Sequence, residues 1–269
     1  MEMQSIRPAA VAGTFYPGTG RALADEVATL LGAVAPTPSS SQPKALIVPH
    51  AGYIYSGQTA AHAYALLAPW AQTIRRVVLL GPCHRVAVRG LAAPRSTAFA
   101  TPLGNVPLDR EAIVAALTLP QVVQHDAPHA MEHSIEVQLP FLQTVLNNFT
   151  LAPFAVGNAS PGEVAEVLDL LWGESETLVV VSSDLSHYHD YANAQRRDRA
   201  TVEDILQLLP LSDHEQACGA TPINGLIELA QRRSLKPELL DLRNSGDTAG
   251  DRSRVVGYAS FTFAESDHG

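Results

Sequence analysis

Three apolar runs in this sequence each lead into residues that can do chemistry. The runs and the residues after them are Ala45 to Val48 before His50, Arg75 to Leu80 before His84, and Thr177 to Val181 before Asp184 and His187. Imidazole and carboxylate groups that meet in one crevice suit either a first-row transition metal or general acid–base catalysis. Their spacing along the chain leaves both chemistries open.

These side chains can meet only if the three runs are neighbouring strands of one sheet. Each run has the length and β-branched content of a buried strand, and Pro49 cannot extend the first one. Strand-like and helix-like segments alternate along the chain, which predicts an α/β fold with a central, mostly parallel or mixed sheet and helices on both faces. The carboxyl ends of parallel strands share one edge, so residues as distant in sequence as His50 and His187 can face one cavity.

The remaining segments predict the surroundings of that sheet. We expect a single domain over residues 1–269, beginning with an extended arm at 1–17 that has no helical periodicity. A helix is predicted from Arg21 to Leu31, and the Pro- and Ser-rich segment 33–43 is predicted to be a loop. A further helix is expected to begin near Ser56, whose hydroxyl can cap it.

Composition excludes several classes of function. The 269 residues carry a formal net charge of −9, so we expect no nucleic-acid partner, which would need a clustered basic surface. No window reaches the ~18 consecutive apolar residues of a membrane span. The N-terminus lacks the apolar core of a signal peptide, so we expect no membrane partner and a cytoplasmic location. The two cysteines are too few for a disulfide framework, but either can bind a metal.

A local motif offers a competing metal site. His129, Glu132 and His133 match H-x-x-E-H, the zinc pattern of the inverted zincin proteases. In that pattern both histidines share one face of a helix and the glutamate acts as base. The motif lacks a downstream acidic ligand in a recognisable setting, and it would leave the strand-end residues without a role. We therefore favour the strand ends as the site.

Motifs along nearly the whole chain resemble those of one known family. In chain order they are A-G-T-F-Y-P (12–17), V-P-H-A-G-Y-I-Y-S-G (48–57), L-G-P-C-H (80–84), T-P-L-G (101–104), E-H-S-I-E-V-Q-L-P (132–140), S-S-D-L-S-H (182–187), C-G-A-T-P-I (218–223) and a closing V-V-G-Y-A-S. The pattern resembles the Memo family (mediator of cell motility), whose microbial members are often called AmmeMemoRadiSam system protein B.

This resemblance implies a fold like that of the class III extradiol dioxygenases, which hold non-haem iron at the edge of an α/β sheet. Carried over by motif, it implies that the metal ligands are His50, His84 and Cys218. It implies acid–base or supporting roles in the same pocket for His133, Asp184 and His187, and substrate contacts from Tyr16, Tyr53 and Glu132. Because a thiolate is a soft ligand, we expect iron(II) first, with copper or zinc as alternatives.

Two functions follow, and the sequence does not choose between them. The first is a metal-dependent redox enzyme with a dioxygenase-like site and a small-molecule substrate. The second is an adaptor that binds a phosphopeptide or other peptide ligand in the same pocket without catalysis. The microbial family name further implies that the chain is the companion of a radical S-adenosylmethionine (radical SAM) protein and of an AMMECR-type protein.

Overall fold

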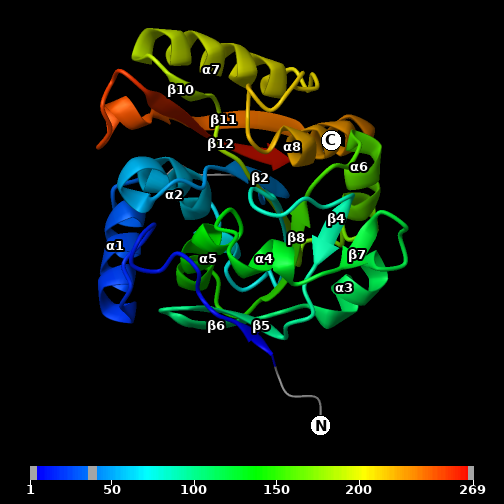
Figure 1. Ribbon diagram of the computed structural model, residues 1–269. Helices are drawn as coiled ribbons and strands as arrows, with labels where there is room; N and C mark the ends of the chain where they lie inside the picture. The colour runs from blue at the N-terminus through cyan, green and yellow to red at the C-terminus, as the bar shows by residue number, and fades with distance from the viewer. Residues whose placement is uncertain (1–4, 36–40, 266–269) are drawn as a thin grey trace.

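The fold is organised by one large sheet of nine strands (Figure 1), in a computed structural model that describes residues 5–35 and 41–265. These strands are β2 (Ala45–Val48), β3 (Arg76–Pro82), β4 (Leu91–Ala93), β7 (Val122–Gln124), β8 (Thr150–Val156), β9 (Thr177–Ser182), β10 (His187–His189), β11 (Lys236–Asn244) and β12 (Val255–Ala264). Their order is β10-β12-β2-β9-β3-β8-β4-β7, and β11 pairs with the other side of β12.

The centre of this sheet is parallel and its flanks are antiparallel. Strands β2, β9, β3 and β8 run in the same direction, with Val48 opposite Ser182 and Leu80 opposite Val181. Strand β12 joins β2 in antiparallel register, and β4 joins β8 in the same way. The four central strands are almost entirely buried, as their unbroken apolar sequences require. The predicted α/β fold with a mixed sheet is confirmed.

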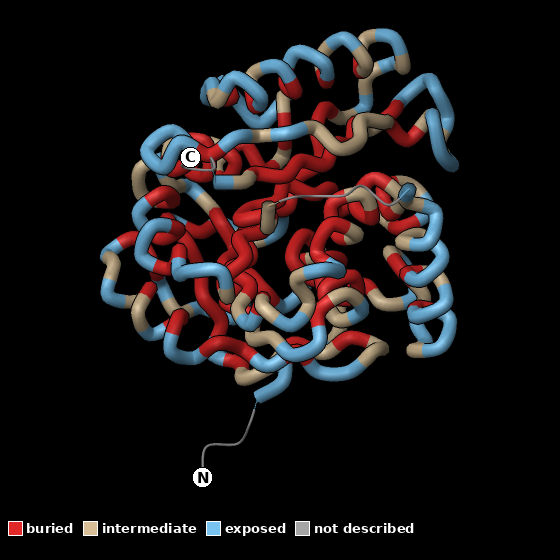
Figure 2. Tube along the Cα trace, turned by 180° about the vertical axis from the view of Figure 1, so that it is seen from behind, coloured by how far each residue is buried: buried red, intermediate tan, exposed pale blue. Residues whose placement is uncertain are grey.

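Helices cover both faces of the sheet. They are α1 (Gly20–Gly32), α2 (Gln58–Ala65), α3 (Arg110–Ala116), α4 (Ala127–Ala130), α5 (Leu139–Val145), α6 (Pro161–Leu170), α7 (Tyr191–Leu206) and α8 (Ala220–Arg233). Helices α1, α2 and α5 pack together, with α2 against β2 and β12, whereas α8 packs against β3, β9 and α6. Figure 2 shows the buried strands in the middle of the molecule and exposed residues along the outer turns of the helices.

The predicted arm joins a second, small sheet that the sequence did not reveal, and residues 13–15 of the arm form a turn instead of extended chain. Strand β1 (Ile6–Arg7) lies parallel to β5 (Ala98–Thr101), which pairs with β6 (Gly104–Pro107) in a hairpin. The T-P-L-G motif at 101–104 forms the turn of that hairpin. Residues 1–4 of the arm, and residues 36–40 of the loop predicted at 33–43, lie outside the described residues.

A helical segment does begin near Ser56, but the predicted cap by its hydroxyl is wrong. A single π-helical turn, Tyr53–Gly57, precedes α2, so Ser56 lies inside a helical segment and not at its beginning. Its hydroxyl donates a hydrogen bond back to the carbonyl of Ala51 over 3.0 Å. Among the described residues, no helix is both long and apolar enough to cross a membrane.

Candidate metal centre

The carboxyl ends of three adjacent strands place the predicted residues at one edge of the sheet. His50 follows β2, Asp184 follows β9, and His84 follows β3. The backbone N–H of His50 donates to Asp184 Oδ1 over 2.7 Å, which joins the first two loops directly. All three residues line a cleft of about 1030 Å³. The residues predicted from the strand ends therefore line one cavity.

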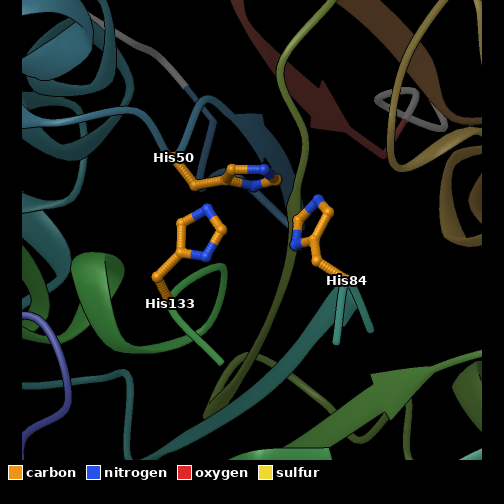
Figure 3. A group of neighbouring side chains, drawn as sticks. All are labelled: His50, His84 and His133. Carbon is orange, nitrogen blue, oxygen red and sulfur yellow. The ribbon is translucent and has the colours of Figure 1, made fainter. Parts of the chain in front are cut away.

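Three imidazoles converge in this cleft. One ring nitrogen each from His50, His84 and His133 lies within 4.8 Å of the other two. The ring centroids are 5.2 Å apart for His50 and His84, 5.3 Å for His50 and His133, and 4.9 Å for His84 and His133. Figure 3 shows the rings facing one another from three separate segments of the chain. His133 comes from the loop after α4, so it joins the two strand-end histidines from the side.

Glu132 orients two of these imidazoles. Its Oε1 lies 2.9 Å from His84 Nδ1 and 3.2 Å from His133 Nδ1. Burial alone would raise the pKa of this carboxyl, but hydrogen bonds from the His84 ring and from backbone N–H groups hold the pKa at about 2. An ionised carboxylate only accepts hydrogen bonds, so His84 Nδ1 carries the proton, and the nearby negative charge favours a proton on His133 Nδ1 as well. This leaves Nε2 as the nitrogen of each ring that is open to a metal, as in carboxylate–histidine–metal arrangements.

Ser182 orients the third imidazole, that of His50, through a hydrogen bond to its Nδ1. Its hydroxyl donates to the carbonyl of Ser134 over 2.6 Å and accepts from Gln138 Nε2 over 2.8 Å. With its only proton committed, the hydroxyl oxygen must accept from His50 Nδ1, which lies 2.9 Å away. His50 thus also keeps its Nε2 free of a proton. Sequence reasoning missed Ser182 and Gln138, which lie inside the quoted motifs at 182–187 and 132–140.

The imidazoles of His50 and His133 are neutral, which is the form that binds metals. Burial and the neighbouring His84 lower the pKa of His50 to about 3. Burial and the neighbouring His50 lower the pKa of His133 to about 4. At neutral pH these two rings therefore present lone pairs and not protons, without competition from hydrogen ions for the metal.

Cys218 lies beside His50 but does not belong to the cluster of His50, His84 and His133. Its Sγ is 3.3 Å from His50 Nε2, and burial together with the charge of Asp184 raises the pKa of the thiol to about 12. The protonated thiol donates to the free Nε2 of His50. Gly219 lets this loop approach β9, because a Cβ there would lie 2.7 Å from the Cβ of Ser183. Cys218 as a ligand stays a prediction.

Asp184 and His187 border two clefts at once. Together with His133 they line the main cleft and also a second one of about 440 Å³. Burial raises the pKa of Asp184 despite the hydrogen bond from His50. His187 pairs with Val256 in the sheet, which fixes its backbone at the rim. These are the positions from which a carboxyl and an imidazole can exchange protons with a bound molecule, and their catalytic role stays a prediction.

The three predicted substrate contacts lie behind the cleft. The Tyr16 hydroxyl donates to Glu136 Oε1 over 2.5 Å, and the Tyr53 hydroxyl donates to the carbonyl of Val137 over 2.7 Å. Glu132 is 2% exposed and its oxygens are occupied by N–H groups. Their substrate contacts remain a prediction, but the observed bonds hold the loop that carries His133.

The alternative zincin motif does not form. Helix α4 ends at Ala130, and His129 points away from the cleft with its Nε2 2.8 Å from the carbonyl of Ala92. His133 lies in the following loop, so the two histidines share no helical face. Our preference for the strand-end site agrees with this geometry.

The donor set fits a transition metal ion. Three imidazoles with an adjacent thiol are nitrogen and sulfur donors, which favour iron(II), copper or zinc over magnesium or calcium. The carboxylate behind His84 and His133 adds the negative charge and the orientation that such ligands need.

A mixed α/β sheet with this histidine cluster at the carboxyl edge of its parallel strands defines a class of protein able to hold a metal ion. Comparison with known sequences then identifies the family: residues 7–262 match the model of the Memo-like proteins, and the chain belongs to this family. A MEMO1 family protein of Aquifex aeolicus is 36% identical over 96% of this chain and 99% of its own length. One from Sulfolobus acidocaldarius is 32% identical over 97% of this chain and 100% of its own length.

A solved structure shares the fold. The uncharacterized protein JW3007 from Escherichia coli K12 superimposes with a TM-score of 0.54 and 13% sequence identity, covering 81% of this chain and 98% of that one. At that identity the likeness concerns the fold alone. It is consistent with the class III extradiol dioxygenase-like fold that the motifs implied.

Proposed function

We propose that this chain is a metal-dependent oxidoreductase that acts on a small molecule bound in the main cleft. The observation that carries the proposal is the set of three imidazoles with fixed tautomers. His84 Nδ1 is hydrogen-bonded to Glu132 and His50 Nδ1 to Ser182, and the Glu132 carboxylate lies 3.2 Å from His133 Nδ1. These contacts favour protons on the Nδ1 atoms and leave the Nε2 atoms for a metal. A cluster with only a structural role would have no need of three unprotonated nitrogens at the wall of an open cleft.

The ion would be held by His50, His84 and His133, with the Cys218 sulfur beside His50 as a further donor. When bound, iron(II) or copper supplies redox chemistry toward O2 or another small oxidant. Zinc in the same place would limit the site to Lewis-acid chemistry. The nitrogen and sulfur donors make iron(II) our first choice, followed by copper and then zinc.

The neighbouring residues supply binding and proton transfer. Burial raises the pKa of Asp184 above that of an ordinary aspartic acid, and this shift toward neutrality suits a group that exchanges a proton with a bound molecule. His187 lies at the rim, where it can exchange protons with solvent. The cleft volume of about 1030 Å³ accommodates a drug-sized ligand, and Arg85 and Thr221 also line it.

Metal content tests the proposal. The wild type, His133→Ala and His125→Ala are purified without oxygen, loaded with iron(II), desalted and analysed for metal. His125 is the matched control, because it is an exposed histidine of the same segment outside the cleft. We expect iron in the wild type and the control and its loss from His133→Ala. Equal iron in all three proteins would refute the site.

Oxygen uptake tests the redox half of the proposal. The iron-loaded wild type should consume O2 faster than the same concentration of free iron(II), and this excess should vanish in His133→Ala. Uptake no faster than that of free iron would refute the oxidoreductase function while leaving the metal site in place.

A further inference from the structure

The loop that carries Glu132 and His133 is held by the N-terminal arm. Between the end of α4 and the 3₁₀ turn Glu136–Gln138 this loop has no regular hydrogen-bonded structure of its own. Arg7 on β1 spans it: its Nε donates to the carbonyl of His129 over 2.8 Å and its Nη2 to the carbonyl of Glu132 over 2.7 Å. Its Nη1 pairs with Glu136. One guanidinium therefore binds the loop at three points.

Glu136 completes the connection from the loop side. Its side chain is fully buried, and every donor that bonds it belongs to the arm. Besides Arg7, these are the backbone N–H groups of Ala10 (2.7 Å) and Val11 (3.0 Å) and the hydroxyl of Tyr16 (2.5 Å). A buried carboxylate satisfied in this way fixes its backbone firmly, because any movement would leave the charge unpaired.

The arm also touches a histidine of the cluster. The ring of Phe15 packs on the ring of His133 with a centroid separation of 4.7 Å, and the carbonyl of Phe15 accepts the N–H of Tyr53 over 2.8 Å. The arm thus contacts both the backbone that precedes His133 and the His133 ring itself.

We propose that Arg7 is a positioning residue that sets the orientation of His133, and through it the metal affinity of the cluster. The planar fork of arginine reaches two carbonyls and one carboxylate together, which lysine cannot do. The metal-affinity part of this inference rests on the proposed function, whereas the orientation of His133 does not.

The test removes the Arg7 guanidinium without leaving the Glu136 carboxylate buried and unpaired. Arg7→Met combined with Glu136→Gln deletes both partners of the ion pair, so the fold is spared the cost of an unpaired carboxylate. Where this double variant fails to fold, Arg7→Lys gives the same test, because it keeps the charge beside Glu136 and loses the bonds to the carbonyls. The matched control is Arg76→Met with Asp109→Asn, an ion pair of 2.7 Å at the opposite end of β3 from His84.

Nitrogen NMR of the imidazoles in the metal-free proteins decides the inference. We expect His133 to show the Nδ1–H tautomer in the wild type and the control, and a mixture of tautomers in the Arg7 variant. His50, which is held by Ser182 and not by the arm, should keep its tautomer throughout. An unchanged Nδ1–H signature of His133 in the folded Arg7 variant would overturn the inference.

Cobalt(II) titration then measures the consequence. Loss of an orienting contact to a metal ligand typically lowers affinity by about 10- to 100-fold. We expect a loss in this range for the Arg7 variant and a change within about 2-fold for the control, which leaves the cluster untouched. A wild type that binds no cobalt would contradict the proposed function, and the tautomer result would still decide the role of Arg7.

Discussion

Replacing Glu132 by glutamine should weaken metal binding strongly, although the two side chains have almost the same size. The substitution keeps the shape and the oxygen corresponding to Oε1, which faces four N–H groups: the Nδ1 atoms of His84 and His133, and the backbones of His133 and Ser134. It replaces Oε2, which accepts the backbone N–H of His84 over 2.7 Å, by an NH2 group. Two donors would then face each other inside the protein.

The contacts of Glu132 set the expected size of both effects through general values for such contacts. A buried N–H left without an acceptor costs about 1–3 kcal/mol of folding stability. Losing the carboxylate that orients and polarises two ligands should cost about 10- to 100-fold in metal affinity. That range corresponds to ~1.4–2.8 kcal/mol of binding free energy.

Zinc affinity measured by competition with a chromophoric chelator checks the second effect, and urea unfolding of the metal-free proteins checks the first. The control is Glu215→Gln, which removes the same charge from an exposed residue of the cleft rim without touching a histidine. An equal loss of affinity in both variants would mean that only net charge matters, and our reasoning about tautomers would be refuted.

Three further predictions follow from other contacts. Cys218→Ser should lower the affinity for cadmium more than that for cobalt, because the softer ion depends more on sulfur; competition titrations that show equal losses would argue against the thiol as a donor. Gly219→Ala should destabilise the fold by about 1–3 kcal/mol in urea unfolding, because its Cβ would lie 2.7 Å from the Cβ of Ser183; wild-type stability would contradict this. Burial raises the pKa of Asp109, but the Ala112 N–H and the Arg76 partner together outweigh it and leave the pKa lowered. Its stabilising contribution should therefore be complete above the unfolded pKa of about 3.9 and disappear as the pH falls through the lower folded value. Acid unfolding curves of Asp109→Asn and wild type should converge at low pH and diverge near neutrality; parallel curves would refute the assignment.

The strand ends of the site could be predicted because their signal is local. Apolar runs mark β2, β3 and β9, and the parallel arrangement brings their ends to one edge whatever lies between them. His50 and His84 therefore followed from the pattern alone, and Asp184 with them. Cys218 came only from the family motif, since a single cysteine before a helix has no distinguishing spacing.

The role of His133 could not be predicted from such a signal. It lies in an irregular loop whose position depends on a buried ion pair between Arg7 and Glu136, 129 residues apart in sequence. No periodicity records a contact of that kind. The neighbouring Glu132 and His129 even suggested a helical zinc motif, which fails because α4 has only 4 residues. The hairpin β5–β6 was missed because each of its strands has only 4 residues, too few to show a clear alternating pattern.

The central claim is that the Nε2 atoms of His50, His84 and His133 bind one ion. X-ray absorption spectroscopy of the zinc-loaded protein measures this most directly. We predict the multiple-scattering pattern of imidazoles with nitrogen at about 2.0–2.1 Å, and its partial loss in His133→Ala. A spectrum dominated by oxygen ligands, or one that is identical in the wild type and in His133→Ala, would contradict the claim.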